Sequence, residues 1–97
     1  MPTYVTLLKF TDQGLRNIKD TVKRSEAARQ AARQGGATIK DIYWLQGQYD
    51  VLVVLESPDE PTAMAFALNT AKAGNVTSQT LRAFTAAEME PVLARVV

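Results

Sequence analysis

The stretch Gly47-Gln48-Tyr49-Asp50, followed directly by Val51-Leu52-Val53-Val54-Leu55, decides the fold. Glycine permits the positive φ angle of a tight turn, so the first four residues predict the turn of a β-hairpin. The next five are all β-branched or leucine, and they predict a strand that is apolar on both faces. Such a strand lies inside a sheet and needs a cover on each side.

Strand and helix signals alternate on the N-terminal side of this hairpin. Thr3 to Phe10 predicts a first strand, which ends at the turn Thr11-Asp12-Gln13-Gly14. A helix follows and ends at Gly35-Gly36, where glycine suits a left-handed C-cap. Ala37 to Gln46 predicts the second strand. The helix carries an apolar stripe of Leu15, Ile18, Val22, Ala28 and Ala32, and six cations predicted to point largely away from it: Arg16, Lys19, Lys23, Arg24, Arg29 and Arg33.

The hairpin pairs this second strand with Asp50 to Glu56, and two further helices and a strand follow. Ser57 is expected to cap the second helix, with Pro58 at its first position and Glu60 completing a capping box. This helix runs to Ala73 and is stopped by Gly74-Asn75. Val76 to Phe84 predicts the fourth strand. Thr85-Ala86-Ala87-Glu88 predicts a capping box for a short closing helix through Val96, which Pro91 should limit or bend.

This element order predicts a single α+β domain over residues 1–97 with ferredoxin-like βαββαβ topology and a C-terminal helix. Its antiparallel four-stranded sheet has the first and third strands at the centre and helices on one face. Leu52 and Val54 are then left on the other face, which should not meet water. A second copy of the chain is the economical cover, so we expect a homodimer or a larger homo-oligomer. The uncharged run from Thr62 to Leu68 strengthens that expectation.

The composition of the chain limits the partners and the catalytic groups that it can have. The 97 residues hold eleven basic and ten acidic side chains, a net charge of +1, which argues against a nucleic-acid surface. Cysteine and histidine are both absent, which removes thiolate and imidazole chemistry, and we expect neither a metal nor a cofactor. No apolar run approaches the ~20 residues that span a bilayer. We therefore expect a soluble, cytoplasmic protein with no membrane partner.

Four short motifs follow one another along the chain: Gly35-Gly36, the Gly-x-Tyr-Asp turn at 47–50, Glu56-x-Pro58-Asp59 and Gly74-x-Val76. Together they resemble the GYD domain family of small bacterial proteins. The Thr11-x-x-Gly14 turn and the closing Thr80-Leu81-Arg82-Ala83-Phe84 extend the resemblance over nearly the whole chain. It implies a dimeric α+β barrel and no established activity. The turn also resembles a hairpin in the ligand-sensing domains of leucine-responsive regulators, where amino acids bind between subunits, but this chain lacks their helix-turn-helix domain.

The turn itself has two interpretations. In the structural one, Gly47 supplies a positive φ angle, Tyr49 packs over the hairpin and Asp50 accepts backbone hydrogen bonds from the turn. In the functional one, Asp50 lies at the mouth of a cleft between sheet and partner subunit and anchors a cationic or hydroxylated ligand, while Tyr49 forms an apolar wall with a polar tip.

Two cations are further ligand-binding candidates. Lys9 shares a strand face with Val5 and Leu7, and Arg82 shares one with Ser78 and Thr80. Either could bind an anionic group; alternatively, Lys9 reaches solvent and Arg82 pairs with a carboxylate such as Asp50 or Glu56. Tyr43 and Trp44 are expected in the core or an interface.

Three function classes remain open. The first is a dimer that binds a small molecule near Gly47, Tyr49 and Asp50, with Lys9 and Arg82 as further contacts. The second is a cofactor-independent monooxygenase or isomerase, as hosted by other dimeric α+β barrels, in which Asp50 or Tyr49 would act as acid or base. The third is a purely structural assembly module. Without histidine, binding is favoured over catalysis.

Overall fold

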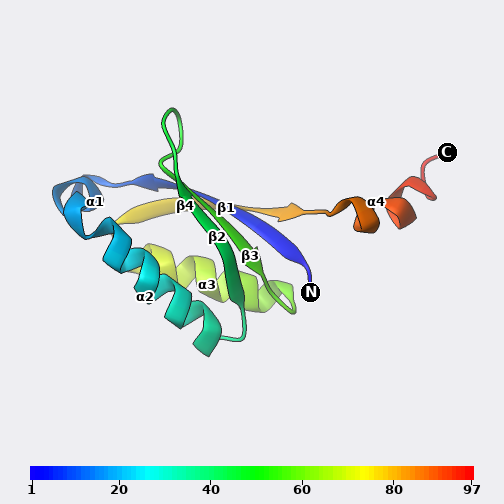
Figure 1. Ribbon diagram of the computed structural model, residues 1–97, viewed down its shortest axis with the longest axis horizontal. Helices are drawn as coiled ribbons and strands as arrows, with labels where there is room; N and C mark the ends of the chain where they lie inside the picture. The colour runs from blue at the N-terminus through cyan, green and yellow to red at the C-terminus, as the bar shows by residue number, and fades with distance from the viewer.

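A computed structural model describes residues 1–97 and contains one four-stranded antiparallel sheet (Figure 1). The strand order is β2-β3-β1-β4, so β1 and β3 are central, as predicted. The ferredoxin-like βαββαβ order with a C-terminal helix is confirmed. Along the chain the elements are β1 (Thr3–Phe10), α1 (Asp12–Arg16), the 3-10 helix η1 (Ile18–Asp20), α2 (Thr21–Gln34), β2 (Thr38–Trp44), β3 (Val51–Glu56), α3 (Glu60–Lys72), β4 (Val76–Ala83) and α4 (Ala86–Leu93).

The two faces of the sheet differ in what covers them. Helices α2 and α3 lie on the same side (Figure 1). Val51, Val53 and Leu55 of β3 point toward these helices and are buried, whereas Leu52 and Val54 point the other way and are half-buried. The core on the helix side consists of ten apolar residues: Tyr4, Leu8, Ala32, Ala37, Ile39, Val51, Val53, Leu55, Ala63 and Phe66.

A cluster of hydrogen bonds joins the end of β1 to the start of β4. Thr11 caps α1 by accepting the N–H of Gly14 at 3.1 Å, and its hydroxyl donates to the carbonyl of Gly74 at 2.6 Å. The N–H of Thr11 donates to the carbonyl of Asn75 at 3.0 Å. A Cβ at Gly14 would lie 2.1 Å from that same carbonyl oxygen, so only glycine fits there. These residues are called the β1–β4 latch below.

The first helical region differs from the single helix that the sequence predicts. It is divided into α1, η1 and α2, and the break lies at Asn17, whose side-chain amide donates to the carbonyl of Gln13 at 3.1 Å. Asparagine side chains compete in this way with helical backbone bonds. Beyond the break α2 takes a new direction, so Leu15 and Val22 of the predicted stripe stay more than half exposed while Ala32 is buried.

The start of α3 and the end of α4 also differ from expectation. The N-cap of α3 is Asp59, which accepts the N–H of Thr62 at 2.8 Å, so the helix begins at Glu60 rather than Pro58. Ser57 is fully buried, and its hydroxyl donates to the carbonyl of Asp59. The capping box of α4 is confirmed, but the helix ends at Leu93, two residues after Pro91, rather than at Val96.

Helix α4 lies apart from the rest of the molecule. It follows β4 and extends beyond the end of the sheet, away from α2 and α3 (Figure 1). The molecule measures 50 Å along its longest axis and only 18 Å along its shortest. Val92 and Leu93 of α4 are exposed. The C-terminal helix therefore covers neither face of its own sheet.

Candidate functional site

The face of the sheet opposite the helices has an apolar centre. Alternation along the strands places every second residue there, and the register aligns these side chains across β3, β1 and β4. We call this surface the open face; its apolar members are Val5, Leu7, Leu52, Val54 and Leu81, with Tyr43 on the edge strand β2. None of these six is fully buried, and Tyr43 is 55% exposed.

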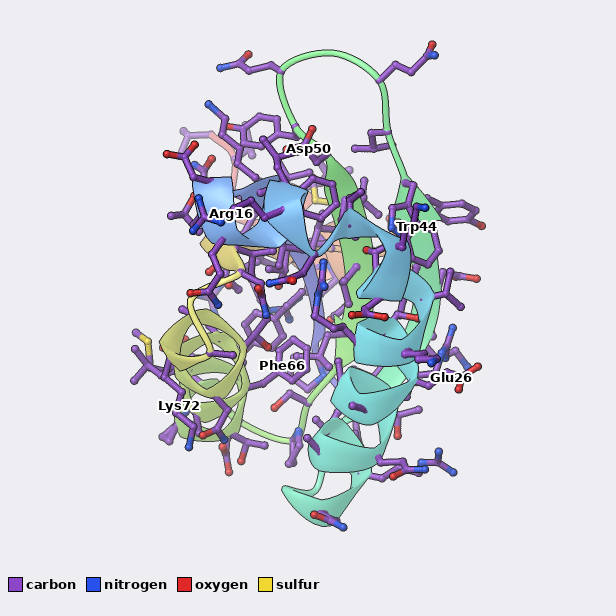
Figure 2. All side chains as sticks on the ribbon, turned by 90° about the vertical axis from the view of Figure 1, so that its left-hand side faces the viewer. Arg16, Glu26, Trp44, Asp50, Phe66 and Lys72 are labelled. Atoms are coloured by element: carbon purple, nitrogen blue, oxygen red, sulfur yellow. The ribbon has the colours of Figure 1, made fainter.

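The Gly47–Asp50 hairpin lies at one end of the open face, and Asp50 anchors it. Its Oδ2 accepts the N–H of Phe10 at 2.8 Å, its N–H donates to the carbonyl of Leu8, and its carbonyl accepts the N–H of Leu45, both at 2.8 Å. Figure 2 shows Asp50 at the base of the projecting loop. Gly47 has a φ angle of 108°, which favours glycine. The positive φ angle of Gly47 agrees with the structural interpretation, but the backbone amide that the Asp50 side chain binds belongs to Phe10 on β1 and not to the turn.

Tyr49 bends over the rim of the open face. Its hydroxyl donates to Oε1 of Gln79 on β4 at 2.9 Å, and the Nζ atom of Lys9 lies 5.3 Å from the centre of its ring. That distance is within the range of a cation–π contact. Lys9 and Gln79 both project on the open-face side of the sheet. The three residues form a polar rim with one positive charge, beside the apolar centre.

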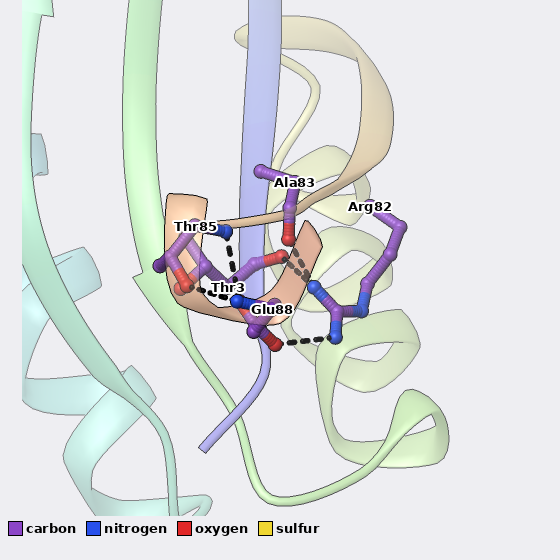
Figure 3. A network of polar contacts seen from close by, with 5 residues as sticks. All are labelled: Thr3, Arg82, Ala83, Thr85 and Glu88. Atoms are coloured by element: carbon purple, nitrogen blue, oxygen red, sulfur yellow. Dashed lines mark hydrogen bonds and ion pairs between the residues drawn. The ribbon is translucent and has the colours of Figure 1, made fainter. Parts of the chain in front are cut away.

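Arg82 belongs to a different cluster, on the helix side of β4. Its guanidinium pairs with Glu88 of α4 at 3.0 Å and donates to the carbonyls of Thr3 and Ala83 (Figure 3). It also lies 4.4 Å from the centre of the Phe84 ring. The carboxylate that pairs with Arg82 is therefore that of Glu88, and not that of Asp50 or Glu56 as the sequence suggested. The backbone N–H of Thr85, and next Arg82, lower the pKa of Glu88. Arg82 fixes how the strand leads into α4.

The structure therefore brings together four of the five candidate residues. Gly47, Tyr49 and Asp50 form the hairpin, and Lys9 reaches the ring of Tyr49. Arg82 lies opposite Tyr4 in the β1–β4 register, and Tyr4 is five residues before Lys9 on β1. At ~3.3 Å per residue, Arg82 is therefore about 17 Å from Lys9 along the strands. Lys9 and Arg82 also project from opposite faces of the sheet.

Two functional candidates were missed in the sequence. Gln79 carries no signal until the β1–β4 register is known, because only that pairing brings it near Tyr49. Arg24 was counted among the cations that point away from the apolar stripe. Instead its Nη1 atom donates to the carbonyl of Asn17 at 2.7 Å, and the side chain folds toward the space between α2 and α3. Arg29 also turns inward, donating to the carbonyl of Ile39.

The side chains at the rim offer groups that can bind a ligand. Tyr49 and Lys9 offer a hydroxyl, an aromatic face and a cation, while one oxygen of Asp50 is engaged by the backbone of Phe10. No group of three or more Asp and Glu side chains is arranged to hold a metal ion. None of the helices combines the length and apolar character that crossing a membrane requires.

The β2-β3-β1-β4 sheet with both long helices on one face places the chain in the ferredoxin-like class of α+β proteins. The chain belongs to the GYD domain family, whose model, described as GYD domain, matches residues 4–93. A relative from Thermus thermophilus, the "Glutamine synthetase and cystathionine beta-lyase binding protein", is 30% identical over 90 residues, which cover 92% of this chain and 95% of that protein. The β1–β4 latch and the hairpin glycine account physically for three of the family-like motifs: Thr11-x-x-Gly14, Gly74-x-Val76 and the turn at 47–50.

Proposed function

We propose that this protein is a non-catalytic binding protein that works as a homodimer, with the open faces of two sheets packed against each other. The observation that carries the proposal is the apolar centre of the open face, which no helix of the same chain covers. An exposed apolar patch rimmed by polar side chains is typical of an interaction surface. A two-fold dimer buries the same patch on both partners.

The dimensions of the open face support a role for α4 in the same interface. Four strands at ~4.8 Å and about seven residues at ~3.3 Å give a flat footprint of about 19 by 23 Å, or about 440 Å². Stable interfaces bury about 800 Å² per partner. The apolar side chains of α4, which lie beyond the end of the sheet, would supply further area on a neighbouring subunit.

The dimer is tested with Val54→Lys, which places a charge at the centre of the open face. Light scattering coupled to gel filtration should give twice 10.6 kDa, about 21 kDa, for the wild type and the monomer mass for the variant. Gln34→Lys on the exposed end of α2 is the matched control and should leave the dimer intact. A wild-type mass of 10.6 kDa at micromolar concentration contradicts the proposal.

We also propose a small-molecule site at the rim, between the sheet and the partner subunit. Tyr49 and Lys9 would contact a polar or anionic ligand, while Gly47 and Asp50 hold the hairpin in position. The support is the shared location of these four residues at the edge of the open face. Native mass spectrometry of the purified dimer should show a co-purified small molecule that is lost in Lys9→Met without loss of the dimer. A ligand-free dimer argues for pure assembly.

Binding of a metabolic enzyme is a second candidate function, suggested by the name of the Thermus relative. If the dimer occupies the open face, the enzyme needs another surface, and Met64 and Leu68 on the outer side of α3 are each 61% exposed. Purified glutamine synthetase and cystathionine β-lyase would each be mixed with the protein in sedimentation velocity runs. Met64→Glu should abolish a complex while leaving the ~21 kDa dimer, and no co-sedimentation of the wild type excludes this candidate.

A further inference from the structure

A cavity of about 320 Å³ lies on the helix side of the sheet, between α2 and α3. Its lining is mostly apolar and includes Leu8, Ile42, Val53, Phe66 and Val76. Figure 2 looks toward the two helices and shows Phe66 in the space that separates them. The cavity is on the other side of the sheet from the open face, so it is independent of the surface proposed for self-association.

The sequence of α2 explains why this space is not filled. The residues of α2 that line it are mainly alanines, at positions 27, 28, 31 and 32, whose small methyl groups fill little of the space. Protein interiors are packed to near-crystalline density, and apolar cavities lower stability. A cavity of this size also falls within the range of small-molecule sites, which begins at about 300 Å³.

One charged side chain lines the cavity, and one of its nitrogen atoms has no acceptor. Arg24 lines the cavity, and while its Nη1 atom donates to Asn17, its Nη2 atom is buried and donates to no protein atom. The guanidinium is always protonated, and a buried charged donor without a partner is costly. A carboxylate is the acceptor that matches it best. A dianion such as phosphate would find no second cation among the lining residues.

We propose that this cavity binds a small amphipathic carboxylate, whose apolar chain lies among the α2 alanines and Phe66 and whose carboxylate pairs with the guanidinium of Arg24, the only charged side chain of the lining. A helix from a second copy is the competing occupant. The charge of Arg24 favours the small molecule, because a carboxylate is its best acceptor.

Trp44 provides a reporter at the site, because it is the only tryptophan of the chain and lines the cavity. Its indole N–H donates to Thr21 at 3.0 Å. The probes are octanoate and 1-octanol, which share a chain length and differ in charge, together with 8-bromooctanoate, whose bromine quenches indole on contact. Saturable quenching by 8-bromooctanoate, relieved by excess octanoate, is expected for the wild type.

The decisive variant is Arg24→Met, which keeps an unbranched apolar stem and removes the guanidinium with its charge. Its octanoate affinity should fall at least about tenfold, the effect of losing one charge-assisted hydrogen bond. Its affinity for 1-octanol should be unchanged, which also shows that the cavity is still formed. Arg33→Met, on the exposed side of the same helix, is the matched control and should bind both probes as the wild type does.

Three results would overturn the proposal. They are equal wild-type affinities for octanoate and 1-octanol, an equal loss of octanoate binding in Arg24→Met and Arg33→Met, and no saturable response of Trp44 up to millimolar octanoate. The last result is also the one expected if a helix of a second copy fills the cavity.

Discussion

Replacing Asp50 with alanine measures how much its carboxylate contributes to holding the hairpin on the sheet. The Oδ2 atom of Asp50 accepts the N–H of Phe10 at 2.8 Å in a partly buried setting. The substitution deletes this charge-assisted bond and leaves the amide of Phe10 without its acceptor. Such a loss lowers the free energy of unfolding by about 2 kcal/mol. For a domain of this size the melting temperature should fall by roughly 8–16 °C.

The assay is urea unfolding followed by far-ultraviolet circular dichroism, with every variant at the same protein concentration because the stability of a dimer depends on it. Asp50→Asn keeps a neutral acceptor and should lose less than Asp50→Ala. Asp41→Ala removes an exposed carboxylate of β2 and should stay within about 0.5 kcal/mol of the wild type. If Asp50→Ala is equally stable but loses a co-purified ligand, the carboxylate serves the ligand site and the reasoning above is refuted.

Two further predictions concern the glycines and the acid stability of α3. Gly47→Ala should cost about 1–2 kcal/mol of stability, because only the positive φ angle opposes a side chain there. Gly14→Ala should cost more in urea unfolding, because it forces a Cβ against the carbonyl of Asn75. Equal losses in the two variants would contradict the packing at the latch. The side chain and then the backbone N–H of Thr62 lower the pKa of Asp59. Because the folded pKa lies below the unfolded one, Asp59 stabilises α3 above pH ~4 and this contribution disappears as the pH falls through the folded pKa. Asp59→Asn should flatten the pH dependence of the free energy of unfolding in that window. An unchanged profile would mean that another carboxylate causes this pH dependence.

The sheet was predictable because its signals are local and redundant. The β3 run from Val51 to Leu55 has only apolar residues, so its central place follows from burial alone, whichever strands lie beside it. The hairpin turn was equally accessible through Gly47, whose positive φ angle is a local requirement, whereas the bond from Phe10 to Asp50 joins residues forty apart and could not be read from the turn. Capping at Thr85 was predicted for the same reason: a capping box involves residues three apart.

Predictions failed where the outcome depends on tertiary contacts. Asp59 rather than Ser57 caps α3 because Ser57 is drawn into the fully buried layer beside the N-terminus, where its N–H donates to the carbonyl of Pro2. Arg24 lies on a helix rich in cations, and only the break at Asn17 turns its side chain toward the cavity. Neither event leaves a pattern in the local sequence.

The β1–β4 latch has a consequence for the order in which the chain folds. β1 is synthesised first, yet one of its two neighbours, β4, begins only at Val76. Until β4 arrives, one edge of β1 presents unpaired N–H and carbonyl groups, and such an edge pairs readily with other chains. Closing the latch therefore ends the period in which a nascent chain is exposed to aggregation. Variants at Gly14 should show their effect in the yield of soluble protein before they show it in the properties of the folded state.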